Sequence, residues 1–459
     1  MKHFFTFAWR KLYFEDHVSS FDFVMEKQSL STSKWFNEGR QMAMLSHRLH
    51  LPFRFGLPDA IKYKINVSDD LKPYVTELRS KQSLYDKQVD KHLRQLVYID
   101  ETREQRRTIA ASEPALSHVA MEGWLFYGVH AFDHDLSSER PRLVTAILGL
   151  LRPFQKFAGS NAGDVGEIAA QVLILSSVDD AKCRQNRPDW ALALDVPIEQ
   201  LLRKQEDLTK MIRELDHIIT VPAFLTSLLS DAAVEALGHQ PDSKAFLEEM
   251  AQYSFYLTHF IQTRCEQNLV SKSALRKMGT RGLGVITPPR FPGVDMVIPI
   301  FRRGDMSEVT LLQVQVNNRG TRTSFKRGWA SMETMAVSKT LPMLNILFDF
   351  CHKEQKPRGL AKDAIALSKR HATKREGTRN EAKAGPKTSK PNHWRLSIRG
   401  SDKSVYRGLD DQGSLQTYLD VYEAAFYTDK NHTAQQCVLE QASLDEHVSM
   451  NLDAETVKE

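Results

Sequence analysis

The sequence predicts an α plus α/β protein, in which a helical N-terminal region precedes a mixed sheet flanked by helices. Two observations predict this fold class. Up to about residue 280, apolar residues recur mainly at the three- and four-residue spacing of amphipathic helices. Beyond that point, short runs rich in Val, Ile and Leu are separated by turns and by one helical segment, as in a sheet whose strands are joined by helices.

The helical N-terminal region is expected to span 1–157. The spacing of its apolar residues predicts helices at 21–30, 31–49, 84–109, 113–131 and 139–157. Ser112 is suited to cap the fourth of these helices, because Pro114 then lies in the first turn, where its missing N–H is not needed.

The core is expected at 158–352, with a helical insertion at 197–270. Its first element is a strong helix at 163–182, and further helices are predicted at 197–216, 221–236 and 242–268. Strands are predicted at 293–301, 309–317 and 344–350, with a helix at about 329–339 before the third strand. A strand at 393–400 and a helix at 414–427 are expected to close the core within 393–430.

The net charge of +5 is concentrated in one segment. Between Lys353 and Lys390, twelve Lys or Arg residues accompany only four acids, and large apolar residues are few. This composition predicts a disordered basic insert at 353–392, whereas 431–459 forms an acidic tail. A basic run of this kind can contact phosphate or direct nuclear import, or it can simply be a solvated loop.

Composition excludes several classes of protein. The 41% of hydrophobic and 26% of charged residues are ordinary for a soluble globular protein. No apolar run approaches the roughly 20 residues needed to cross a bilayer, and the N-terminus lacks a signal-peptide cleavage site, so we expect an intracellular protein, nuclear or cytoplasmic, without a membrane partner. The four cysteines form no C-x-x-C pair, which fits a reducing compartment.

Polar side chains alternate with apolar ones along the strand predicted at 309–317. Gln313, Gln315 and Asn317 therefore share one face, and Asp295 opens the preceding strand. A polar row on a core strand is costly unless it is hydrogen-bonded or has a task. Because Mg²⁺ prefers oxygen ligands, these residues predict a cation site, although Asp295 could instead cap the turn after Gly293.

A further carboxylate is expected from the helix at 163–182. Asp164, Glu167 and Gln171 lie on one side of that helix, which makes Glu167 the candidate. The alternative is an exposed first-turn acid that the helix dipole favours.

Several segments, taken in order, resemble a lineage-expanded family of fungal proteins with a restriction-endonuclease-like, or PD-(D/E)XK, domain. They are SEPALSHVAMEG (112–123), GDVGEIAAQVLIL (163–175), FPGVDMVIPI (291–300), LLQVQVNNR (311–319) and WRLSIRGSDKSVYRGL (394–409). The resemblance covers about 110–430 and implies Glu167, Asp295 and Gln315 as the metal-facing set. Asn317 stands where that family commonly has lysine, so the resemblance implies a degenerate catalytic site with weak or absent cleavage. Such domains are often linked to mobile elements or to effector-like proteins.

The expected function is therefore binding of nucleic acid, DNA in the first place, with Mg²⁺ and no organic cofactor. Candidate phosphate contacts are the cations Arg319, Arg322, Lys326, Arg327, Lys369, Arg370, Lys374 and Arg375. One alternative is a non-enzymatic interaction or effector-like protein that uses the nuclease-like fold as a scaffold, and another is a zinc site at His130 and His134. No G-x-x-x-x-G-K-[ST] motif occurs, so an NTPase partner would be a separate chain.

Overall fold

The structure is a computed structural model that describes the core and short parts of the N-terminal region. The described residues are 47–49, 54–55, 94–99, 106–110, 117–118, 120–121, 144, 147–148, 151, 162–186, 217–262, 271–287, 293–303, 305–318, 341–350, 360–371, 392–409 and 414–419. The expected helices at 21–30, 197–216 and 329–339 lie outside these residues.

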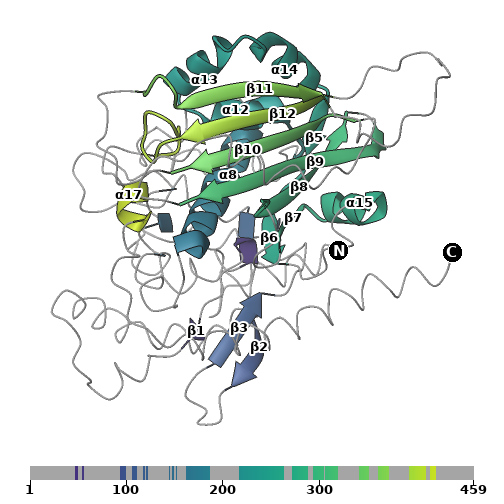
Figure 1. Cartoon of the computed structure of the whole chain (residues 1–459). Helices are drawn as coiled ribbons and strands as arrows, with labels where there is room; N and C mark the ends of the chain where they lie inside the picture. The colour runs from purple at the N-terminus through teal and green to yellow at the C-terminus, as the bar shows by residue number, and fades with distance from the viewer. Residues whose placement is uncertain are drawn as a thin grey trace, which may run out of the picture.

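In this part of the chain, nine strands form one mixed sheet (Figure 1). Its main path runs in the order β11 (Ile365–His371), β12 (Asn392–Arg399), β10 (Met343–Asp349), β9 (Asp305–Asn317), β8 (Met296–Arg302), β5 (Tyr253–Phe255) and β4 (Ile219–Thr220). A side branch is formed by β7 (Leu283–Ile286), which pairs with both β8 and β6 (His259–Gln262).

The directions of these strands bring several strand ends to one edge of the sheet. β9, β10 and β12 run parallel, whereas β8 is antiparallel to β9, and β11 is antiparallel to β12. The last residues of β9, β10 and β12 therefore share an edge with the first residues of β8 and β11. We call this the carboxyl edge.

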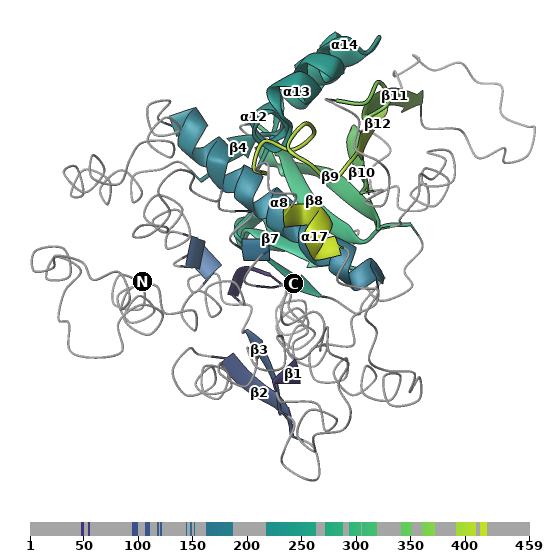
Figure 2. The same ribbon diagram turned by 90° about the vertical axis from the view of Figure 1, so that its left-hand side faces the viewer.

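Helices cover one face of the sheet, which we call the helix face. α8 (Ala162–Asn186), α12 (Val221–Leu228), α13 (Asp231–Gly238) and α14 (Ser243–Met250) lie on this side (Figure 2). Leu312 and Val314 of β9 are buried there in one cluster with Val172 of α8. On the opposite face, α15 (Lys272–Thr280) packs over β8 and β9, where Leu275 meets Val297 and Leu311. Because side chains alternate along a strand, the residues between these apolar positions define the two faces.

Local capping explains where the short helices begin. Thr220, Ser230 and Ser271 each accept a hydrogen bond from the backbone N–H three residues ahead, as N-cap residues do. The single helix expected at 221–236 is consequently two helices, because Ser230 is extended and starts α13 after α12 has ended.

Most elements expected in the core are confirmed. The strands predicted at 293–301, 309–317, 344–350 and 393–400 are β8, β9, β10 and β12, and the helix predicted at 163–182 is α8. The expected closing helix begins as α17 (Ser414–Leu419). β7 and α15 had no counterpart among the expected elements.

The helix expected at 84–109 is wrong. β2 (Arg94–Ile99) and β3 (Arg106–Ala110) pair there as antiparallel strands, and β3 also pairs with β1 (Arg54–Phe55). The segment fits both the helical and the strand period. Its apolar residues are spaced as in a helix, but Leu96 and Tyr98 also alternate with their neighbours as in a strand. Pairing with β3 decides between the two.

Two further expectations are wrong. The helix predicted at 242–268 ends at Met250, and the chain continues as β5 and β6, because Tyr253 and Phe255 bury their rings beside β8 and β4. The insert expected to be disordered contains β11, in which Ile365 and Leu367 are buried as an edge strand on β12.

Candidate functional site

Asp295 lies at the carboxyl edge, one residue before β8. Its backbone N–H donates to the carbonyl of Val314 over 2.8 Å, and its own carbonyl accepts from Thr287 N–H over 2.9 Å. The N–H of Val316 donates to the Asp295 carboxylate, with 2.6 Å between N and Oδ2. The carboxylate of Asp295 thus accepts a hydrogen bond from a backbone N–H of β9 at the point where the backbone pairing of β8 with β9 stops. The backbone itself fixes the position of this carboxylate.

The surroundings of Asp295 disfavour its ionised form. Burial raises the pKa of Asp295 to about 6 from an ordinary value of 3.8, although the hydrogen bond from Val316 acts in the opposite direction. A carboxylate that is desolvated in this way is stabilised by a nearby cation, because the opposite charge favours the ionised form.

The N-terminal end of α8 approaches the same part of β9 from the helix face. A Cβ atom placed on Gly166 would lie 2.6 Å from Cβ of Asn318 and 3.1 Å from Cγ1 of Val316, so only glycine allows this approach. Glu167 is the next residue of α8 and is half-buried. Gly166 of α8 and the carboxylate of Asp295 therefore both meet one residue, Val316.

The amide row lies on the other face of the sheet. Val314 and Val316 pack with the α8 cluster, so the alternating residues Gln313, Gln315 and Asn317 face away from α8. Gln313 is fully buried, whereas Gln315 and Asn317 are half-buried. The structure thus brings Asp295 beside the row, but it separates the row from the helix that carries Glu167. Asn318, whose side chain meets Gly166, is a polar residue on the helix face, and no pattern in the sequence singled it out.

Beside the row, these residues offer a divalent cation two oxygen ligands. Asp295 offers a carboxylate oxygen and Gln315 an amide oxygen, both of the ligand type that Mg²⁺ prefers. Within the described residues, no three side chains of the His, Cys, Asp and Glu types come together as a metal-binding group. An amide carries no charge, so a site built in this way would bind more weakly than one with two carboxylates.

An acid and a base at the carboxyl edge were not expected from the sequence. Asp349 ends β10 in register with Asn317, and Arg399 ends β12 in register with Asp349. Arg399 Nε donates to Asp349 Oδ2 over 2.9 Å, and its Nη1 donates to Asp363 Oδ2 over 2.5 Å. Asp349 is fully buried and Arg399 nearly so. The available signal was that both residues end apolar strands, as Asn317 does.

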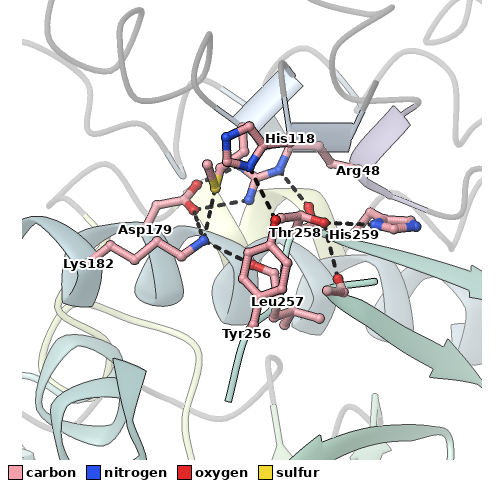
Figure 3. A network of polar contacts seen from close by, with 10 residues as sticks. Arg48, His118, Asp179, Lys182, Tyr256, Leu257, Thr258 and His259 are labelled. Carbon is pink, nitrogen blue, oxygen red and sulfur yellow. Dashed lines mark hydrogen bonds and ion pairs between the residues drawn. The ribbon is translucent and has the colours of Figure 1, made fainter. Parts of the chain in front are cut away.

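A second polar cluster is buried at the other end of α8 (Figure 3). Arg48 binds Asp179 through both oxygens of the carboxylate, at 2.5 and 3.1 Å, and also donates to the carbonyl of Thr258 over 2.9 Å. Lys182 lies 3.6 Å from Asp179 and donates to the carbonyl of Leu257 over 3.0 Å. Isolated buried charges are costly, and here each charged group has an opposite charge or carbonyls to meet it.

Neutral polar groups surround these charges. His118 shares a hydrogen bond of 3.2 Å with the hydroxyl of Tyr256, and His217 packs edge-on against His118. Burial lowers the pKa of Lys182 to about 8, against the effect of Asp179, and lowers the pKa of both His217 and His259 to about 3. The cluster joins 47–49, 117–118, 120–121, α8 and the segment between β5 and β6, so its evident role is to fasten these segments together.

The residues expected to contact phosphate are only partly described. Lys369 of β11 lies with its Nζ 5.3 Å from the centre of the Trp394 ring, a cation–π contact, and Arg370 follows it in the same strand. The other expected cations, namely Arg319, Arg322, Lys326, Arg327, Lys374 and Arg375, lie outside the described residues, as do His130 and His134.

Comparisons with known proteins give no family. No family model, no curated protein and no solved structure matches the chain. No helix in the described ranges is both long enough and apolar enough to cross a membrane.

Proposed function

We propose that this protein binds nucleic acid through a restriction-endonuclease-like core whose cleavage activity is weak or lost. DNA is the first candidate for the nucleic acid. The observation that carries the proposal is the convergence at Val316. An acid that opens one strand, a polar neighbouring strand and a preceding helix with its own acid are the parts of the nuclease-like layout, and Asp295, β9 and α8 meet at this residue.

The chemistry of β9 argues for binding rather than efficient cleavage. A hydrolytic site of this type needs a second carboxylate to hold the metal and a cation to stabilise the charge that develops on the phosphate. Gln315 and Asn317 supply neither charge. The carboxylate of Asp295 and the amide oxygen of Gln315 would hold a Mg²⁺ ion, which when bound would polarise a phosphate group.

The proposal is tested by measuring duplex DNA binding as a function of salt. Phosphate contacts release counterions, so the logarithm of the affinity should fall linearly with the logarithm of salt concentration, with a slope of about −0.9 for each phosphate neutralised. Absent binding, or an affinity that does not change with salt, would overturn the proposal.

A metal titration separates this function from that of a scaffold. Mg²⁺ or Mn²⁺ should raise the melting temperature of the wild-type protein and leave that of Asp295→Ala unchanged. If neither cation affects the wild type, the metal site is refuted and the result favours the alternative of a non-enzymatic scaffold.

A further inference from the structure

We propose that side chains of β9, β10, β12 and β11, on the face of the sheet opposite α8, bind an adenine nucleotide. Asn345 and Ser397 would hold the base, and Arg395 would hold the phosphate. The site does not involve Asp295 and needs no metal, so the inference goes beyond the proposed function.

The register between strands places four polar residues on one level of the sheet. Gln313 of β9 pairs with Asn345 of β10. Asn345 also pairs with Arg395 of β12, and Arg395 pairs with Ser368 of β11. We call these four residues the cross-strand row. Paired residues of neighbouring strands point to the same face, and strands are about 4.8 Å apart, so the row is about 14 Å long. A base, a sugar and a phosphate can lie along a row of this length.

The cross-strand row leads from solvent into the interior. Ser368 is exposed and Arg395 is half-buried, whereas Asn345 is 4% exposed and Gln313 is fully buried. At the inner end Gln313 pairs with Val297, which packs in the apolar cluster under α15. At the outer end β11 is the last strand of the described sheet (Figure 1). A ligand would therefore enter beside β11 and end against apolar side chains.

Two buried polar groups near the inner end lack a hydrogen bond. Oδ1 of Asn345 and Oγ of Ser397 have no partner in the described part of the chain, and Ser397 is fully buried. Ser397 pairs with Leu347, two residues after Asn345, so the two groups are diagonal neighbours on one face, roughly 8 Å apart between Cα atoms. Buried polar groups are normally hydrogen-bonded, so a group that lies between them and reaches both would remove this cost.

The chemistry of these two groups favours a base over a simple anion. An amide oxygen only accepts hydrogen bonds, so a phosphate oxygen cannot satisfy Asn345, whereas an N–H of a base can. An amide side chain offers a donor and an acceptor side by side, which match the N6 and N7 edge of adenine. Met343 and Leu347 flank Asn345 on the same face and are buried. Apolar lining with a few polar groups is typical of sites for small ligands.

Arg395 adds a positive charge between these groups and the solvent. Burial lowers the pKa of Arg395, because partial removal from water disfavours the charged form. An anion beside the guanidinium would offset this effect, and the planar fork of a guanidinium binds phosphate through two parallel hydrogen bonds. A nucleotide whose base lies at Asn345 would place its phosphate toward Arg395, one strand nearer the outer end.

The base site is tested by calorimetry with adenosine monophosphate, on the full chain and with a chelator present. Asn345→Leu and Ser397→Ala each remove a hydrogen bond from a buried site, so we expect each to weaken binding at least tenfold. Ser227→Ala is the matched control and should stay within twofold of the wild type. Its Oγ is likewise buried and lacks a partner among the described residues, but it belongs to α12 on the helix face.

Two results would overturn the base site. A wild type that binds no adenosine monophosphate would mean that water satisfies Asn345 and Ser397. Equal effects of Ser397→Ala and Ser227→Ala would mean that the loss of a buried hydroxyl acts through stability alone. Ser397→Ala is a small change, so the comparison remains available if Asn345→Leu does not fold.

The phosphate site is tested by comparing adenosine monophosphate with adenosine. The wild type should bind the monophosphate at least tenfold more tightly, and Arg395→Gln should reduce this preference to less than twofold. An unchanged preference in a folded Arg395→Gln protein would refute the role of the guanidinium. Inorganic phosphate that binds as tightly as adenosine monophosphate would show that the base is not recognised, and would overturn the inference.

Competition identifies the source of the nucleotide. Single-stranded oligodeoxyadenylate that displaces adenosine monophosphate assigns the site to a base of a nucleic acid, whereas failure to displace it assigns the site to a free nucleotide. Asp295→Ala should bind adenosine monophosphate as the wild type does, and loss of binding in the folded variant would overturn a separate site. A protein that binds adenosine monophosphate but no duplex DNA would refute the proposed function alone, and the converse result would refute this inference alone.

Discussion

Replacing Asp295 by asparagine should stabilise the protein at neutral pH, although it removes a residue of the proposed site. Asparagine has nearly the same shape, and its Oδ1 can still accept the hydrogen bond from Val316. What disappears is the cost of holding an ionised carboxylate where burial raises its pKa to about 6. Stability given up for a functional charge is a common feature of active sites.

The sign and size follow from proton linkage. Between pH 3.8 and about 6 the folded protein holds a proton on Asp295 that the unfolded chain has released, so the free energy of unfolding falls as pH rises through this window. The difference between these pKa values corresponds to about 3 kcal/mol, and the partial exposure of the residue reduces the expected loss to about 2 kcal/mol. The asparagine variant does not suffer this loss.

The assay is urea unfolding of both proteins with a chelator at pH 3.5, 5.5 and 7.5. The difference in unfolding free energy, variant minus wild type, should rise by about 2 kcal/mol between the first and last pH. Asp305→Asn is the control, because Ser307 lowers the pKa of this exposed carboxyl and the difference should then change in the opposite direction. A difference for Asp295→Asn that is constant with pH would refute the reasoning.

Three further outcomes are expected. Arg48→Ala should lower the free energy of unfolding in urea by about 3–5 kcal/mol, because it leaves the buried carboxylate of Asp179 without this guanidinium. Arg184→Ala breaks a surface ion pair with Asp180 on α8 and should lower it by less than about 1 kcal/mol. Equal losses for the two variants would contradict this prediction. Gly166→Ala should lower stability by about 1–3 kcal/mol through overpacking against β9, while Gly238→Ala, where a Cβ meets nothing within 4 Å, should be neutral or stabilising in thermal unfolding. Relative to Lys182→Met, the wild type should gain up to about 3 kcal/mol between pH 8 and 10.5, because the unfolded chain holds the proton there and the folded protein does not; a flat difference would contradict the lowered pKa.

The strands and the long helix of the core could be predicted because their patterns are local. α8, β8, β9 and β10 each carry a continuous apolar face of the right period, and no partner is needed to recognise it. The segments that were misassigned, β2, β3, β5 and β11, are short and fit more than one period. Their strand form depends on hydrogen bonds to a neighbouring strand, which lies close in sequence for β2 and β3 and far away in sequence for β5.

The candidate site likewise has a part that follows from local sequence and a part that does not. The sequence alone determined that Asp295 opens a strand and that Gln313, Gln315 and Asn317 share a face, because alternation along one strand follows from backbone geometry. Only the tertiary structure decided that α8 packs on the other face of β9, and that Asp349 and Arg399 extend the row. Register between strands is set by packing and hydrogen bonding across the whole sheet, so residues more than thirty positions apart become neighbours for reasons that no local pattern contains.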